Sequence, residues 1–236
     1  MVQISTGPDN FIFDAYYTLL IRNSDWFTMN CPSTKELTGP VNFSHIHQDV
    51  FTLWLTWLTT GNIESAGECL VIAPGLKTEL LQGQMHRKRI QLIECYVLAE
   101  FLVDRRYMNY IMDQIISFSK QFHAACGPPQ GLGEGGRLIF KKTREGSLLR
   151  KLELDIFLST VSLESMSPRS DVDSHGNKCK ITEHFYWQFA MLATRVAREG
   201  KKVPPPPWQG NKCAYYHDHS DVEKKYACEE GLVSLL

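Results

Sequence analysis

A segment rich in glycine and proline, residues 124–146, constrains this chain more than any other feature. Within it, residues 125–136 have few side chains large enough to pack, so the segment predicts a linker or an exposed loop rather than part of a core. It separates residues 1–123 from residues 147–236. A chain of 236 residues has room for one large domain or two small ones, and either could bury an apolar core.

The composition and charge argue against several classes of protein. Hydrophobic residues make up 43% of the chain, which predicts a folded protein rather than a disordered one. A formal net charge of −1 argues against nucleic-acid partners, because nucleic-acid binders need a basic surface. The sequence shows no secretory signal and no apolar stretch near the ~18 residues of a membrane span, so we expect a cytoplasmic or nuclear protein that does not bind a membrane. Seven cysteines without regular spacing predict reduced thiols rather than a disulfide framework.

Residues 1–123 have the pattern of a small sheet combined with amphipathic helices. Short apolar runs flank turn-forming residues, and apolar residues recur three and four positions apart in the longer segments. We expect strands at 2–4, 11–13 and 41–43, and helices within 15–29 and at 48–60, 90–102 and 107–122. Residues 62–88 are less regular and suggest an insertion.

Residues 147–236 predict a mainly helical C-terminal region. Apolar residues at helical spacing favour helices at 148–161 and 183–198, with a polar loop at 162–180 between them. The four prolines at 204–207 predict extended backbone, which is suited to a stiff spacer or to a polyproline ligand for an aromatic groove. A tail containing cysteine and histidine follows.

Several phrases of the sequence are similar to phrases of the fungal BTB/POZ proteins. Residues 50–61, VFTLWLTWLTTG, resemble the phrase F-x-x-F/W-L-x-W-L-Y-T-G, and residues 96–102, YVLAEFL, resemble Y-V-L-A-D-K-L. Residues 148–157, LLRKLELDIF, are similar to S-P-L-R-R-L-x-V-D-x-Y, and residues 213–219, CAYYHDH, to C-x-Y-H-x-H. The resemblance covers nearly the whole chain and is thinnest at 62–88 and 162–180.

Residues near the predicted hairpin both match and depart from the family pattern. Ser24 and Phe27 match a phrase Ser-Pro-x-Phe that follows the first strands, and Asp25 replaces its proline. The His-Lys pair that usually follows the second strand is absent, because Asp14 and Ala15 stand there. This departure affects partner contacts made through those positions rather than the fold.

The resemblance implies an α+β fold, in which a BTB/POZ domain over 1–123, a small sheet capped by a helical cluster, precedes the mainly helical C-terminal region. Family members associate through their first helix and amino-terminal strand, and bind partners such as cullin scaffolds. We therefore expect a protein–protein interaction module that acts by homo- or hetero-association. The alternatives are a substrate adaptor of a cullin-type ubiquitin ligase and a small zinc-binding regulatory protein. Because the chain begins directly at the hairpin, we expect weak self-association.

Four potential metal ligands lie within sixteen positions near the end of the sequence. Cys213, His217, His219 and Cys228 form the pattern C-x3-H-x-H-x8-C, which supplies the ligand types of a tetrahedral zinc site. The spacing is not that of a familiar zinc finger, and two histidines two positions apart point to opposite sides of an extended segment. The alternative is a solvated tail with incidental cysteine and histidine. Zinc is the sole cofactor that the sequence suggests.

Other motifs have ordinary structural explanations. His45 and His47 precede a predicted helix and are expected in loop or capping positions. Residues 131–136 satisfy G-x-G-x-x-G, but they follow two prolines rather than a strand and are not expected to open a helix, which argues against a nucleotide site. Cys126 near His123 shows no helix start or cationic pocket that would lower a thiol pKa. We therefore expect no catalytic residues and no enzyme.

Overall fold

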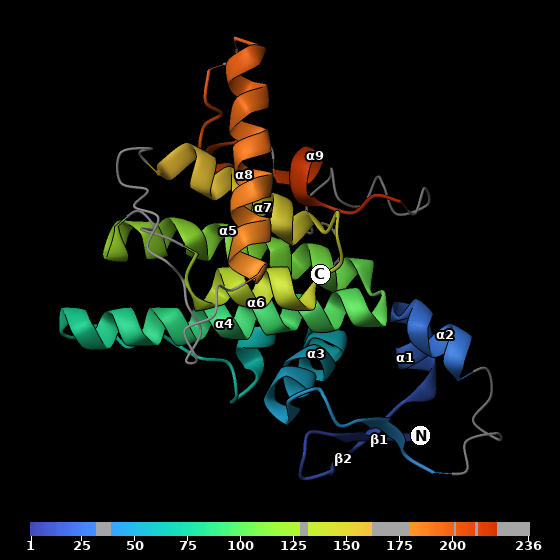
Figure 1. The fold of residues 1–236 in the computed structure, drawn as a ribbon. Coiled ribbons are helices and arrows are strands. Elements are labelled where there is room, and N and C mark those ends of the chain that lie inside the picture. Colours follow the sequence, from blue (N-terminus) through green and yellow to red (C-terminus); the bar gives the residue numbers. More distant parts are fainter. Residues whose placement is uncertain (32–38, 128–131, 162–179, 201, 211, 221–236) are drawn as a thin grey trace. The chain divides into compact units, whose positions relative to one another are not determined.

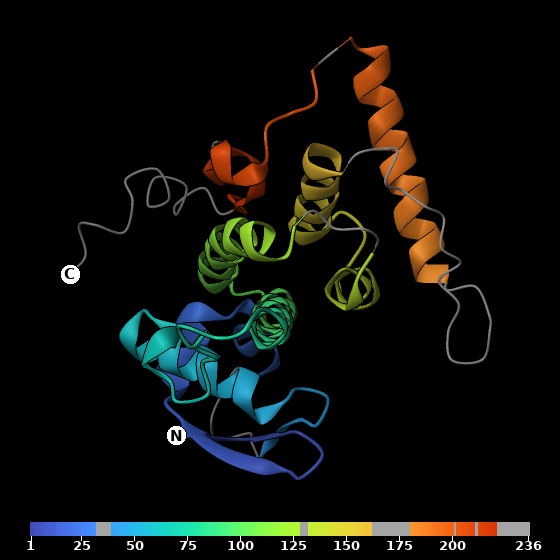
Figure 2. The ribbon, with the colours of Figure 1, turned by 90° about the vertical axis from the view of Figure 1, so that its left-hand side faces the viewer.

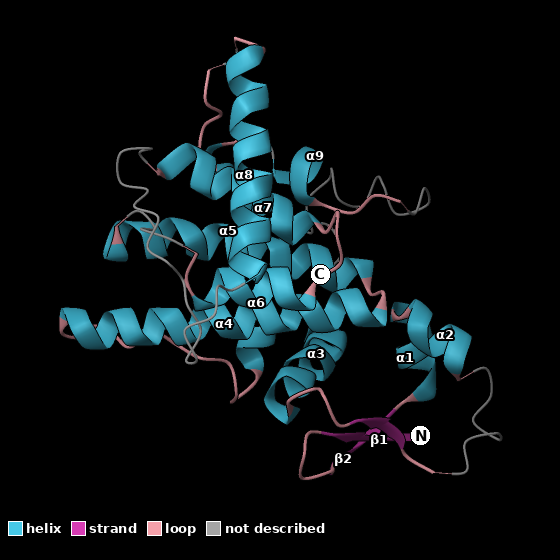
Figure 3. Ribbon diagram, in the orientation of Figure 1, coloured by secondary structure: helices cyan, strands magenta, loops and turns pink. Residues whose placement is uncertain are grey.

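The protein forms two compact units, Met1–Ile111 and Met112–Leu236. The structure, a computed structural model, describes all residues except 32–38, 128–131, 162–179, 201, 211 and 221–236 (Figure 1). Its architecture is α+β and mainly helical, as expected, and all strands of the described residues lie in the first unit (Figure 3). Within this described part, no helix is both long enough and apolar enough to span a membrane. The expected loop at 162–180 falls almost entirely outside the described residues.

The sheet of the first unit has three strands, where the sequence predicted them. Strands β1 (Val2–Thr6) and β2 (Phe11–Ala15) form an antiparallel hairpin, and β3 (Val41–Phe43) pairs with β1 in parallel. The strand order is therefore β2-β1-β3, with β1 in the centre. Figure 2 shows the hairpin at one margin of the unit. Gly7 and Asn10 form the hairpin turn with positive φ angles of 70° and 53°.

Two short helices and one longer helix cover one face of this sheet. Helix α1 (Tyr17–Asn23) and helix α2 (Asp25–Asn30) meet at Ser24, as the sequence predicted. Helix α3 (Gln48–Thr60) ends at Gly61, whose φ of 75° is the left-handed conformation typical of a glycine at this position. Side chains from these elements bury an aromatic core whose ring centroids lie between 4.9 and 6.1 Å apart. Its members are Trp26, Phe27, Phe43, Phe51 and Trp54.

Helix α4 is longer than the sequence predicted. We expected a helix from residue 90 and a less regular insertion over 62–88, but α4 spans Thr78–Leu102, so residues 78–88 belong to a regular helix. The first turns of α4 conceal the helical pattern because Leu80 is exposed and Gly83 interrupts the apolar spacing. The preceding loop contains a 3-10 turn, η1 (Ile63–Ser65), and is fixed to α4 by Gln91, which donates to the Glu68 carbonyl and accepts from the Leu70 N–H.

Helix α5 (Arg105–Cys126) begins at a buried carboxylate. Asp104 is fully buried, and one of its oxygens accepts the Tyr107 N–H at 3.0 Å, which caps the start of α5. The other oxygen accepts the indole N–H of Trp54 at 3.0 Å. Before it, Val103 has a φ of 53°, a conformation that costs a residue with a side chain about 1–2 kcal/mol. The two Asp104 hydrogen bonds stabilise this tight connection between α4 and α5.

The glycine-rich segment contains a helix rather than a continuous linker. Helix α6 (Glu134–Lys142) lies inside the expected loop 124–146 and buries Ile139 and Phe140. A Cβ on Gly136 would collide with the Leu132 side chain and lie 3.0 Å from the Glu153 carboxylate. Gly136 therefore allows a close approach that a larger residue would prevent. Here the lack of side chains promotes packing, whereas we expected it to prevent packing.

The remaining helices of the second unit surround α7 (Leu148–Thr160), which lies where it was predicted. This helix contacts α6, α8 (Lys180–Arg198), the 3-10 turn η3 (Pro207–Gln209) and α9 (Lys212–Tyr216). Rings on α6, α7 and α8 meet around Phe185, which is fully buried. The prolines before residue 207 lie outside helices and strands, whereas Pro207 begins η3, so the expectation of extended backbone was wrong for this last proline.

Candidate functional site

Polar contacts hold the short helix α9 against α7. The Tyr216 hydroxyl donates to the Asp155 carboxylate at 2.9 Å. Burial of the hydroxyl, and to a lesser extent the negative charge of Asp155, raise the pKa of Tyr216 well above its usual range. Lys151 forms an ion pair with Asp155 at 3.3 Å, and its ammonium lies 4.4 Å from the centre of the Tyr216 ring. A helix of five residues is not stable alone, so these contacts give α9 its position.

Helix α9 and the residues after it bring three potential metal ligands together. One ligand atom from each of Cys213, His217 and His219 lies within 4.8 Å of the others. Within the group, Cys213 Sγ and His219 Nε2 lie 3.1 Å apart. Cys213 and His219 are partly exposed, whereas the side chain of His217 is largely buried. The group therefore combines one thiol and two imidazoles, of which the thiol and one imidazole are partly accessible to solvent.

The His217 ring also contacts a carboxylate from α5. Its Nε2 lies 3.2 Å from Asp113 Oδ1, and only 7% of the His217 side chain is exposed. A carboxylate beside one ring nitrogen orients the imidazole and favours the tautomer in which the other nitrogen is free to bind a metal. Asp113 lies far from the tail in the sequence, and nothing in the spacing of residues 213–228 points to it.

The structure brings together three of the four predicted ligand residues. Cys213, His217 and His219 lie together, whereas Cys228 lies outside the described residues. His217 and His219 would point to opposite sides only if the segment that contains them were an extended strand, and it is not. Instead, Cys213 and His217 are separated by one turn, with a hydrogen bond from the His217 N–H to the Cys213 carbonyl, and the chain after α9 turns His219 toward them.

The first unit offers a different kind of candidate, an exposed strand edge. Strand β2 pairs with β1 on one side, and among the described residues no strand pairs with its other side. Apolar side chains follow this edge: Phe11, Ile12 and Tyr16 are 50%, 46% and 68% exposed. We call these three residues and β2 the edge surface. An exposed edge of this kind can add a strand from another chain.

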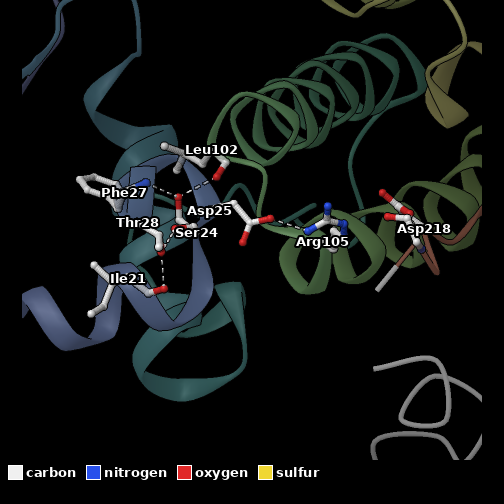
Figure 4. A network of polar contacts seen from close by, with 9 residues as sticks. Ile21, Ser24, Asp25, Phe27, Thr28, Leu102, Arg105 and Asp218 are labelled. Carbon is white, nitrogen blue, oxygen red and sulfur yellow. Dashed lines mark hydrogen bonds and ion pairs between the residues drawn. The ribbon is translucent and has the colours of Figure 1, made fainter. Parts of the chain in front are cut away.

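The helices beside the hairpin are fixed by the polar network in Figure 4. The Ser24 hydroxyl donates to the Leu102 carbonyl at 2.6 Å and accepts from the Phe27 N–H at 3.3 Å. An ion pair joins Arg105 to Asp25 at 2.6 Å. These contacts connect α2 to the junction between α4 and α5, so the first unit is a rigid support for its surface.

The other sequence motifs have structural roles. His47 caps α3, because its Nδ1 accepts the Asp49 N–H, as expected for a capping residue. The expectation that residues 131–136 open no helix was wrong, since Gly133 is the N-cap of α6. Among the described residues, the element before α6 in the chain is helix α5 rather than a strand, and the Glu153 carboxylate lies beside Gly136, an unfavourable neighbour for a phosphate. Burial raises the pKa of the Cys126 thiol, which keeps it protonated at neutral pH.

Comparison of the chain with protein-family models, curated proteins and solved structures found no match. The function of the protein is therefore inferred from its own residues and contacts.

Proposed function

We propose that the protein is an interaction module of the BTB/POZ type that binds another protein chain through the edge surface, with a second copy of itself as the first partner to test. The observation that carries this proposal is the open edge of β2, bordered by the exposed side chains of Phe11, Ile12 and Tyr16. The order of elements, with a hairpin, two helices, a strand and then further helices, agrees with the order in which the sequence resembles that family.

The edge surface has the chemistry for pairing with another strand. The outer N–H and C=O groups of an edge strand supply main-chain hydrogen bonds, and neighbouring apolar side chains supply buried area. Neighbouring residues of a strand point to opposite faces, so the side chains of Phe11 and Ile12 lie on different faces of β2. Ile12 lies opposite Ser5 in the strand register. On the other face, the Phe11 ring contacts the Phe13 ring, with centroids 5.0 Å apart. Apolar groups therefore border both faces of the outer strand.

The strands that carry the edge surface are packed against the core of the unit. Phe13 packs on Phe51 of α3 with ring centroids 5.1 Å apart, and Ile4 of the central strand is fully buried. A preformed surface loses little conformational entropy on association. The net charge of −1 adds little repulsion between two copies of the chain. Both properties favour self-association, although they do not make it strong.

Sedimentation velocity over a concentration series tests the proposal. We expect the wild-type chain to dimerise reversibly and Ile12→Lys to raise the dissociation constant at least tenfold, because a charge at the edge opposes strand pairing. Leu80→Lys is the matched control, since Leu80 is 61% exposed on α4, outside the edge surface, and should leave dimerisation unchanged. A wild-type chain that stays monomeric at every concentration would refute self-association and direct the search to a different protein partner, such as a cullin scaffold.

A further inference from the structure

We propose that Cys213, His217 and His219 bind a zinc ion that closes the segment from the short helix α9 to residue 219 into a loop. The proposal is independent of self-association, because it concerns other residues and another unit. It depends on the convergence of three ligand atoms within 4.8 Å and on the contacts that already orient them.

The ligand types select zinc among the common divalent ions. One thiolate and two imidazoles form a mixed sulfur and nitrogen set, which suits zinc and related transition metals and does not suit calcium or magnesium. Zinc accepts three protein ligands and completes its tetrahedron with water or a further ligand. The three described residues are therefore sufficient for a zinc site.

The distances fit a site that needs only small adjustments. Two ligand atoms on one tetrahedral zinc ion lie roughly 3.5 Å apart, given bonds of about 2.0 and 2.3 Å to nitrogen and sulfur. Cys213 Sγ and His219 Nε2 are 3.1 Å apart and would separate slightly, whereas no pair in the group exceeds 4.8 Å. Small rotations of the Cys213 and His219 side chains, both only partly buried, can supply these changes.

Asp113 would position one of the ligands. Because His217 Nε2 faces the Asp113 carboxylate, Nδ1 is the nitrogen that would coordinate the ion. Outer carboxylates of this kind typically change metal affinity 10–100-fold. Asp113 is therefore a positioning residue, and its substitution should weaken binding without removing the sulfur ligand.

The bound ion would give α9 a second attachment. Tyr216 holds one side of α9 on Asp155 of α7, and His217 connects the other side to Asp113 of α5. A metal that links residues 213 and 219 would close the segment between them into a loop and oppose its fraying. We expect zinc to slow amide exchange in residues 212–219 more than elsewhere in the chain.

The decisive experiment is metal titration of the full chain. The protein is purified with a non-thiol reductant, treated with a chelator, and titrated with Co²⁺ and then Zn²⁺ while its absorbance is recorded. We expect one equivalent of Co²⁺, a charge-transfer band that only a thiolate ligand gives, and displacement by Zn²⁺. Cys213→Ser should abolish the band, and His219→Gln should weaken binding at least a hundredfold. Asp113→Asn should keep the band but weaken binding about 10–100-fold.

Matched controls separate this site from incidental binding. Cys126→Ser and His123→Gln remove a cysteine and a histidine of the same unit that lie outside the ligand group, and both should bind zinc as the wild type does. Circular dichroism of each variant excludes unfolding as the cause of a loss, and His219→Gln adds a test on a residue beyond the end of α9. Binding of less than one equivalent by the wild type, or an undiminished charge-transfer band in Cys213→Ser, would overturn the proposal.

Discussion

The two units stabilise helix ends with buried charges of opposite sign. In the first unit, the Asp104 carboxylate lies at the start of α5, where backbone N–H groups are unsatisfied. In the second unit, the Arg150 guanidinium lies at the end of α6, where it donates to the carbonyls of Phe140 and Thr143 and to the Thr143 hydroxyl. Each charge therefore matches the polarity of the helix end that it contacts.

The units differ in what surrounds those charges. Asp104 lies beside a dense aromatic core that includes Trp54, whereas Arg150 stacks over one ring, Phe140, at 5.0 Å from its centre. The first unit also has a sheet, and the second has helices alone among its described residues. The second unit also packs aromatic rings around Phe185, and polar contacts from Lys151 and Asp155 fix the short helix α9.

The largest effect should come from Asp104→Ala. It removes a helix cap, worth about 1 kcal/mol, and leaves the buried Trp54 N–H without its acceptor, which costs about 1–3 kcal/mol, so we expect a loss of about 3 kcal/mol. Urea denaturation followed by tryptophan fluorescence measures it. Asp25→Ala, which removes a partly exposed ion pair with Arg105, should cost less than about 1 kcal/mol. Equal effects of the two variants would contradict the special role of Asp104.

Arg150→Met should have the next largest effect and should act on the second unit. It removes the donors to two α6 carbonyls while keeping most of the apolar stem, and we expect a loss of about 2–3 kcal/mol. Hydrogen exchange by mass spectrometry should show faster exchange in α6 and α7 than in α3. The control is Lys142→Met on the exposed side of α6. If both units lose protection equally, the comparison between two separately stabilised units fails.

Two helical glycines sharpen the comparison because they should respond in opposite directions. Gly136→Ala places a methyl group against Leu132 and Glu153 in the second unit, and overpacking should cost about 1–3 kcal/mol. Gly83→Ala in α4 meets nothing within 4 Å, so the better helix propensity of alanine should stabilise the first unit by up to about 1 kcal/mol. Thermal denaturation measures both. Stabilisation by both substitutions would show that α6 does not need its close approach.

The last prediction concerns zinc affinity rather than folding stability and involves Cys228, the fourth ligand suggested by the sequence. If it completes the zinc tetrahedron, Cys228→Ser should weaken zinc binding about tenfold, which is about 1.4 kcal/mol. Competition with a chelator of known affinity measures the change. An unaltered affinity would mean that water or another group takes the fourth position.

Much of the fold could be predicted because it depends on local pattern. The hairpin, the Ser24 junction and the end of α3 at Gly61 follow from turn chemistry and from apolar periodicity. Helix α6 could not be predicted, because its glycines are poor helix formers and only contacts with Leu132 and Glu153 favour them. The first turns of α4 were missed for a similar reason.

The candidate metal site shows the same limit. Its ligand types could be read from the sequence, since cysteine and histidine spacing is a local property. Their convergence could not, because it requires one helical turn at α9 and a change of direction before His219. Asp113 had no sequence signal, since its role depends on α5 lying beside α9.

By itself, therefore, the sequence determined the strands, the helices with regular apolar spacing and the residue types that are available for chemistry. The tertiary structure alone decided which buried charges meet helix ends, which glycines allow close packing, and which apolar side chains border an outer strand of the sheet. The physical reason is that periodicity and turn preferences act between near neighbours. Contacts such as Trp54 with Asp104 join distant residues, and they form only when the whole unit folds.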